Sequence, residues 1–269
     1  MTPGNLLFAI FGAVAGLLLG GVVNWLADTF PQRFIPQAPK YLDGALRPRK
    51  AWSGLLAFLT GARKSAGGAK LSWRYPLVEI GMIALYVYIA LAFPVSIRSV
   101  IWMINIVFLM LITVIDLEHR LILYVVIVPA CVVALVGSAI VGVVPFQDYL
   151  IGGAVGFGLF FIFFLGGVLF ISVMASARGE AVDEVAFGFG DVLLATLSGF
   201  MLGWQALIFA ILLTVFLGAF GAIMYLVVQW IGRGKYVMFT ALPYGQYIVI
   251  GTLIMLIWRE PVRIMLQGR

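Results

Sequence analysis

The sequence predicts an all-α, polytopic membrane protein with about eight transmembrane helices. Of its 269 residues, 64% are hydrophobic and only 10% are charged, and the mean hydropathy is +1.14. Apolar runs of about twenty residues recur along the chain, which is the length that an α-helix needs to cross a bilayer. The runs do not alternate apolar with polar residues, so a transmembrane β-barrel is excluded.

The apolar runs divide the chain into spans and one long polar segment. The predicted spans are residues 5–26, 76–93, 99–117, 121–141, 149–174, 192–204, 205–228 and 242–258. Glycines at four-residue spacing in the first span, among them Gly12, Gly16 and Gly20, predict that it packs closely inside the bundle. We expect three parts: a first transmembrane helix (1–26), a cytoplasmic loop (27–75) and a seven-helix catalytic membrane domain (76–269).

The basic residues predict the orientation of the chain. Residues 27–75 contain nine Lys or Arg, and placing them in the cytoplasm puts thirteen basic residues inside and four outside. The positive-inside rule favours this arrangement. The net charge of +6 is therefore a sign of membrane topology and not of nucleic-acid binding. Cys131 is the only cysteine, so no disulfide and no cysteine metal site can form within the chain.

Two aspartates flank apolar spans, one at the end of a span and one at the start of another, in a way that suggests acid–base chemistry. Asp191 closes the sequence Gly188-Phe-Gly-Asp, and Asp116 closes the third span. The predicted topology places both at the cytoplasmic edge, and an ionisable group at membrane depth is by default a functional candidate. Two carboxylates that share a site drive their pKa values apart, so one can activate water while the other donates a proton. Without side chains, Gly188 and Gly190 would let a substrate backbone pass close to the acid.

Each candidate also has a structural interpretation. Asp191 follows a glycine and precedes an apolar run, as a helix cap would, and Asp116 is a candidate for a solvated charge near Glu118. Glu79 is a possible substrate contact, although we favour an ion pair with Arg74. His119 is the only histidine, so we expect a local hydrogen bond and no metal site.

Five blocks of the sequence resemble those of the type IV prepilin peptidases, which are membrane aspartyl proteases of the G-x-G-D type. The blocks are residues 16–24 followed by Pro31, 72–79, 115–122, 188–194 and 235–247. The resemblance implies that the catalytic residues are Asp116 and Asp191, and it makes Pro243 and Gly245 possible substrate contacts. It extends over almost the whole chain and is far more specific than G-x-G-D alone.

The resemblance implies an enzyme of the inner (plasma) membrane with its active site facing the cytoplasm. Such enzymes remove the basic leader of prepilins and pseudopilins by cutting after a glycine, just before an apolar helix. Proteolysis needs no cofactor, but many members also methylate the new N-terminus from S-adenosylmethionine. The implied partners are prepilin substrates and the lipid bilayer, with no nucleic acid.

The sequence departs from the family in two places. Many members carry two Cys-x-x-Cys pairs in the first cytoplasmic loop, which resemble a zinc site, whereas residues 27–75 contain no cysteine. This loop must therefore be ordered in another way. The first catalytic block usually continues into Pro-Asp or Pro-Asn, but here Ile122 is followed by Leu123 and Tyr124.

Two other functions remain open at this point. A presenilin-like or signal-peptide-peptidase-like protease shares the G-x-G-D sequence but cuts within the bilayer. A proton-coupled transporter could use an acid pair as a proton relay, although internal repeats and broken helices are not evident.

An acidic segment precedes the GFGD sequence. It contains Glu180, Asp183 and Glu184 beside a single basic residue, Arg178. We expect it to attract the basic leader of a substrate, although exposed ion pairs are weak.

Overall fold

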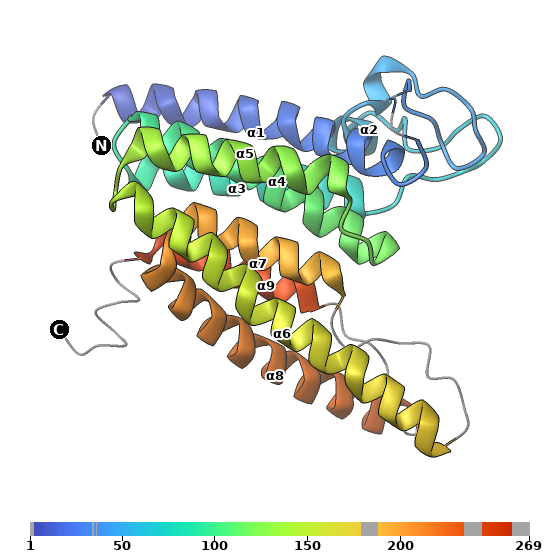
Figure 1. The fold of residues 1–269 in the computed structure, drawn as a ribbon. Coiled ribbons are helices and arrows are strands. Elements are labelled where there is room, and N and C mark those ends of the chain that lie inside the picture. The colour runs from blue at the N-terminus through green and yellow to red at the C-terminus, as the bar shows by residue number, and fades with distance from the viewer. Residues whose placement is uncertain (1–2, 34, 36, 179–187, 234–243, 260–269) are drawn as a thin grey trace. The chain divides into compact units, whose positions relative to one another are not determined.

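The computed structural model describes residues 3–33, 35, 37–178, 188–233 and 244–259. Within this part of the chain, every regular element is a helix, and only two isolated β-bridges are present, Lys40–Leu46 and Lys64–Lys70. The chain forms two compact units, Met1–His119 and Arg120–Arg269. The all-α prediction is confirmed (Figure 1).

Unit 1 consists of three long helices and a loop region that contains a short helix. Its elements are α1 (Pro3–Thr29), the 3-10 helix η1 (Arg49–Ala51), α2 (Gly54–Leu59), α3 (Arg74–Ala92) and α4 (Ile97–His119). In Figure 1, the loop region lies at the end of unit 1 where α1 ends and α3 begins. The predicted second and third spans therefore correspond to α3 and α4.

The glycines of α1 make a close helix contact in unit 1. A methyl group added at Gly16 would lie 2.8 Å from the Cα atom of Ile83, and one at Gly20 would lie 2.9 Å from the Cα atom of Glu79. Only residues without a side chain allow the two backbones to come so close. The predicted close packing of the first span is confirmed, with α3 as its partner.

The long polar loop has a small apolar core of its own. Its buried members are Tyr41, Ala51, Ala57, Leu71 and Tyr75. Because Tyr75 belongs to α3, this core fixes the loop to the start of that helix. The prediction that the loop is ordered without cysteine ligands is confirmed for its described residues.

Unit 2 combines two very long helices with three shorter ones. Its elements are α5 (Tyr124–Val141), α6 (Phe146–Arg178), α7 (Phe189–Leu202), α8 (Trp204–Arg233) and α9 (Tyr244–Ile257). Proline at position 129 lies within α5. Figure 1 shows α6 and α8 continuing well beyond the start of α7.

Backbone contacts at glycines also hold α6 against α7. A methyl group at Gly156 would lie 2.4 Å from the carbonyl oxygen of Ala195, and one at Gly199 would lie 2.2 Å from that of Gly152. The two helices are therefore antiparallel, with Gly152 opposite Gly199 and Gly156 opposite Ala195. This pairing sets the level at which α7 begins along α6.

Six helices in the described residues are long and apolar enough to cross a membrane: α1, α3, α4, α5, α6 and α8. The two other predicted spans are apolar helices of fourteen residues each, α7 and α9. At 1.5 Å per residue, such a helix is about 21 Å long, which is shorter than the roughly 30 Å hydrocarbon core. The protein is a polytopic helical membrane protein in which two apolar helices are short.

Candidate functional site

Asp191 lies in the first turn of α7 and helps to cap that helix. Gly188 is the N-cap residue, and its backbone N–H donates to Oδ2 of Asp191 at 3.1 Å. A carboxylate at this position is favoured because the amides at a helix N-terminus create a partial positive charge. The alternative of a helix cap is therefore correct in part, with Asp191 at the third helical position and not at the N-cap itself.

The two glycines of the GFGD turn have different surroundings. A methyl group at Gly190 would lie 2.9 Å from Cβ of Ile122, whereas among the described residues the atoms nearest to one at Gly188 are Gly190 N at 3.9 Å and Asp191 Oδ2 at 4.0 Å. The missing side chain of Gly190 thus makes room for Ile122 of the same unit. The segment that follows Asp116 in the sequence therefore contacts the turn that carries Asp191.

Aromatic contacts fix the starts of α7 and α9 against α6. Phe164 and Phe189 meet edge to face with ring centroids 5.7 Å apart, and Phe160 lies 6.5 Å from Tyr244. Phe160 and Phe164 are one helical turn apart on α6, so Tyr244 and the GFGD turn lie at neighbouring levels along it. Phe160 is almost fully buried, with 2% of its surface exposed.

A buried hydroxyl pair gives the register between α7 and α9. Ser198 and Thr252 share a hydrogen bond of 2.7 Å. Further along both helices, Arg259, just after α9, contacts the carbonyl of Leu202 at the end of α7. The two helices are therefore parallel. Asp191 precedes Ser198 by seven residues, and Tyr244 precedes Thr252 by eight, so the two lie within about 1.5 Å of the same level. Sequence reasoning did not single out Tyr244, which lies within the last of the five resembling blocks.

The apolar surfaces of α6 and α8 extend beyond the level at which Asp191 begins α7. On α6, apolar residues continue from Phe164 to Val173, which is nine residues or about 13 Å. On α8, which contacts Tyr244 at Gly218, they continue to Val228, about 15 Å further. The α6 and α8 helices thus extend past the start of α7 by nearly the same length. Asp191 therefore begins α7 about 13–15 Å short of the apolar ends of α6 and α8.

Asp116 lies in the last turn of α4 in unit 1 and is partly buried. It follows the buried residues Val114 and Ile115, and Glu118 and His119 after it are exposed. The next residue, Arg120, has a left-handed backbone with φ of 53°, a conformation that commonly ends helices. Asp116 therefore lies at the point where the buried face of α4 meets its polar end.

Glu79 holds the short helix α2 in place. Its side chain is fully buried, and its carboxylate accepts hydrogen bonds from the Ser53 hydroxyl at 2.6 Å, from Gly54 N–H at 2.6 Å and from Leu55 N–H at 2.8 Å. The favoured ion pair with Arg74 is therefore wrong. The sequence could not show this because the donors lie more than twenty residues away and face Glu79 only in the folded loop.

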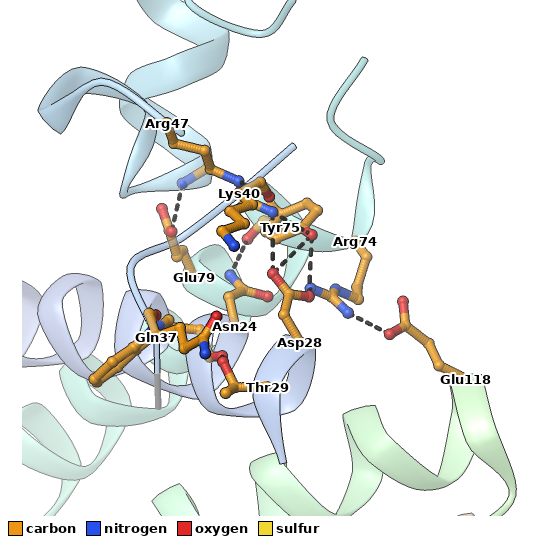
Figure 2. A network of polar contacts seen from close by, with 12 residues as sticks. Asn24, Asp28, Thr29, Gln37, Lys40, Arg47, Arg74, Tyr75, Glu79 and Glu118 are labelled. Atoms are coloured by element: carbon orange, nitrogen blue, oxygen red, sulfur yellow. Dashed lines mark hydrogen bonds and ion pairs between the residues drawn. The ribbon is translucent and has the colours of Figure 1, made fainter. Parts of the chain in front are cut away.

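Arg74 belongs instead to a cluster centred on Asp28, which sequence reasoning missed (Figure 2). Asp28 forms ion pairs with Arg47 at 3.0 Å and with Arg74, and it accepts the Tyr75 hydroxyl at 2.9 Å. Arg74 also pairs with Glu118. The cluster joins the end of α1, the loop, the start of α3 and the end of α4.

A pocket of about 580 Å³ adjoins this cluster in unit 1. Its walls include the aromatic residues Trp25, Tyr41 and Tyr75 and the exposed cations Arg33, Lys40 and Lys70. Asp28 lines the pocket too, but two guanidinium groups already neutralise it. The pocket therefore offers aromatic surface and positive charge to a ligand.

Some predicted site residues lie outside the described part of the chain. They are Glu180, Asp183, Glu184 and Pro243. Gly245 is buried in the first turn of α9, next to Tyr244. Asp116 belongs to unit 1 and Asp191 belongs to unit 2.

Comparison with known proteins identifies a family. The model of the "Type IV leader peptidase family" matches residues 103–223. A "Prepilin leader peptidase/N-methyltransferase" of Pseudomonas putida is 28% identical over 217 residues, or 79% of this chain and 69% of the relative. Relatives with the same name from Stutzerimonas stutzeri and Pseudomonas aeruginosa are 26% and 25% identical over 96% of this chain, and the match covers 93% and 92% of them. No solved structure matches the chain significantly.

Proposed function

This chain belongs to the type IV leader peptidase family, and from that premise we propose that it is a membrane aspartyl endopeptidase that removes the leaders of type IV prepilins and pseudopilins. We assign Asp116 and Asp191 as the catalytic pair. The observation that carries the proposal is the family match, because residues 103–223 include both aspartates and most of the helices that hold them.

The reaction needs one ionised and one protonated carboxylate. The ionised group takes a proton from water, which attacks the carbonyl of the scissile peptide, and the protonated group donates to that carbonyl oxygen. The resulting diol collapses with cleavage of the C–N bond, the group that took the proton from water donates it to the leaving amine, and the other group takes back the diol proton. The surroundings of Asp191 suit the ionised form, because the Gly188 N–H and the start of α7 favour a negative charge. The two protons belong to the pair as a whole, so we leave their distribution open.

We place cleavage on the cytoplasmic side of the inner membrane. The support is the distribution of basic residues, thirteen against four, with residues 27–75 inside. A basic leader would then approach from the cytoplasm while the apolar pilin helix stays in lipid. Glu180, Asp183 and Glu184 remain predicted contacts for that leader.

The depth of Asp191 favours a second candidate, cleavage inside the bilayer as in presenilin-like proteases. Asp191 starts a short helix, and the apolar surfaces of α6 and α8 continue about 13–15 Å past it. The two candidates differ in the peptide bond that is cut. A leader peptidase cuts just before the apolar helix, whereas an intramembrane protease cuts within it.

We also propose methyl transfer to the new N-terminus as a second activity. S-adenosylmethionine would supply the methyl group, and the pocket in unit 1 suits part of it, because Lys40 and Lys70 can bind a carboxylate beside aromatic walls. The two carboxylates of the described pocket lining are already paired with arginines, Asp28 with Arg47 and Arg74 and Glu118 with Arg74, so the pocket suits the carboxylate end of the molecule better than its positively charged group.

One assay tests these proposals together. The purified full-length protein is incubated with a prepilin and labelled S-adenosylmethionine, and the product is sequenced from its N-terminus. We expect a cut after glycine, before the apolar helix, and a labelled N-terminus. Asp116→Asn and Asp191→Asn should each lower the cleavage rate at least about a hundredfold, the usual contribution of a general acid or base.

Each outcome decides one part of the proposal. Near-normal cleavage by either Asn variant, with an unchanged Tm, rejects the catalytic pair. A product cut inside the apolar helix supports the second candidate. Cleavage without label rejects methyl transfer but leaves the peptidase intact.

A further inference from the structure

Tyr244 and Asp191 begin two parallel helices at the same level of unit 2. Two contacts establish this level. The Ser198–Thr252 hydrogen bond of 2.7 Å sets the register of α7 against α9. The contact between Phe160 and Tyr244, with centroids 6.5 Å apart, places Tyr244 where α6 faces the start of α7.

The ring of Tyr244 lies between α6 and α8. A methyl group at Gly218 of α8 would lie 3.3 Å from Cε2 of Tyr244, and the buried Phe160 contacts the ring from α6. The hydroxyl of Tyr244 is within electrostatic range of the Asp191 carboxylate. The helix packing thus holds the ring at the level of Asp191, whose charge acts on the Tyr244 hydroxyl.

The depth of this position makes a partner for Asp191 valuable. A carboxylate in a low-dielectric environment is costly unless hydrogen-bond donors surround it. The N–H of Gly188 donates to one carboxylate oxygen, Oδ2, and a carboxylate has room for several donors. The start of α9 also brings a second helix N-terminus, with its partial positive charge, to the same level.

We propose that Tyr244 is a positioning residue for Asp191 and that the Tyr244 hydroxyl orients the Asp191 carboxylate during cleavage. This inference rests on the proposed function, because it assigns Asp191 to catalysis. The role is specific to the hydroxyl because a Phe would keep every ring contact.

Tyr247 provides a matched control on the same helix. It lies one turn further along α9, and its hydroxyl faces α8, where a methyl group at Gly221 would lie 1.9 Å from it. Tyr247→Phe removes one hydroxyl from α9, as Tyr244→Phe does, but this hydroxyl faces α8 and not the start of α7. The two Tyr→Phe variants therefore separate an effect on Asp191 from a general effect on packing.

The test measures kcat and KM for prepilin cleavage by the full-length protein in its wild-type, Tyr244→Phe and Tyr247→Phe forms. We expect kcat of Tyr244→Phe to fall about tenfold or more, the loss typical of a hydrogen bond to a charged group. Its KM should stay unchanged because the ring still packs against Phe160. Tyr247→Phe should keep both constants. Equal kcat values for the wild type and Tyr244→Phe would overturn the inference, whereas a wild type that cleaves no prepilin would overturn the proposed function.

A second measurement does not depend on activity. The Tm of Asp191→Asn, of Tyr244→Phe and of the double variant forms a cycle that isolates the interaction between the two side chains. We expect the Tm change of the double variant to differ from the sum of the single changes, and the corresponding cycle with Tyr247→Phe to be additive. Additive Tm changes in the Tyr244 cycle would contradict the inference.

Discussion

Asp28 in unit 1 and Asp191 in unit 2 both lie at the end of an apolar helix, but they have opposite surroundings. Asp28 is near the C-terminus of α1, where the helix dipole disfavours a negative charge. Two arginines and a tyrosine hydroxyl compensate for it. Asp191 is in the first turn of α7, where the dipole favours the charge, and a backbone N–H contacts it.

This difference separates a structural carboxylate from a catalytic candidate. A carboxylate held by two guanidinium groups is kept ionised and is poorly suited to proton transfer. A carboxylate stabilised by a backbone N–H and a helix N-terminus, as Asp191 is, is better suited to exchanging a proton with water or substrate. The comparison predicts that changes at Asp28 affect folding, whereas changes around Asp191 affect activity.

Removing the carboxylate of Asp28 should have the largest effect on stability. In Asp28→Ala, the side chains of Arg47 and Arg74, which are only 4% and 14% exposed, lose their shared partner. Leaving buried charges unpaired costs about 3 kcal/mol or more, so residues 37–75 should exchange amide hydrogens faster. Asp28→Asn keeps one carbonyl acceptor and should lose less stability than Asp28→Ala. Unchanged exchange in both variants would show that the cluster does not order the loop.

A methyl group at Gly190 should lower activity more than one at Gly188. In Gly190→Ala, the new Cβ would lie 2.9 Å from Cβ of Ile122, and relieving that overlap costs about 1–3 kcal/mol. The start of α7 would shift, so we expect the cleavage rate to fall about tenfold. Gly188→Ala has open space and serves as the control. Equal rates in the two variants would show that the Ile122 contact does not position Asp191.

The smallest effect is expected at Asp43, which is an exposed carboxylate of unit 1. The hydrogen bond from the Ser65 hydroxyl lowers the pKa of Asp43 below its ordinary value of 3.8, and the Ala45 N–H contributes in the same direction. Because the pKa is lower in the folded state, the stabilisation is present above pH 3.8 and is lost as the pH falls through the folded-state pKa. Ser65→Ala should thus weaken hydrogen-exchange protection around residues 43–45 at pH 6 but hardly below pH 3. The same loss at both pH values would contradict this assignment.

The sequence predicted the helices of this protein well because their signal is local. Apolar runs and the glycines of α1 and the GFGD turn can be recognised without knowing the fold, and α1, α3 and α4 begin and end within a few residues of the predicted spans. Polar partners could not be predicted in the same way. Glu79 was paired with Arg74, five residues before it, whereas its partners come from residues 53–55.

The sequence by itself determined the membrane class, the family blocks and the two aspartates as candidates. Composition and motif spacing are properties of the chain that do not depend on tertiary contacts. Only the tertiary structure decided that α7 and α9 are short, that Asp191 starts below the apolar ends of α6 and α8, and that Tyr244 begins α9 at its level. The reason is geometric. Helix register depends on contacts such as Gly152–Gly199 and Ser198–Thr252, which join residues about fifty positions apart and leave no local signal in the chain.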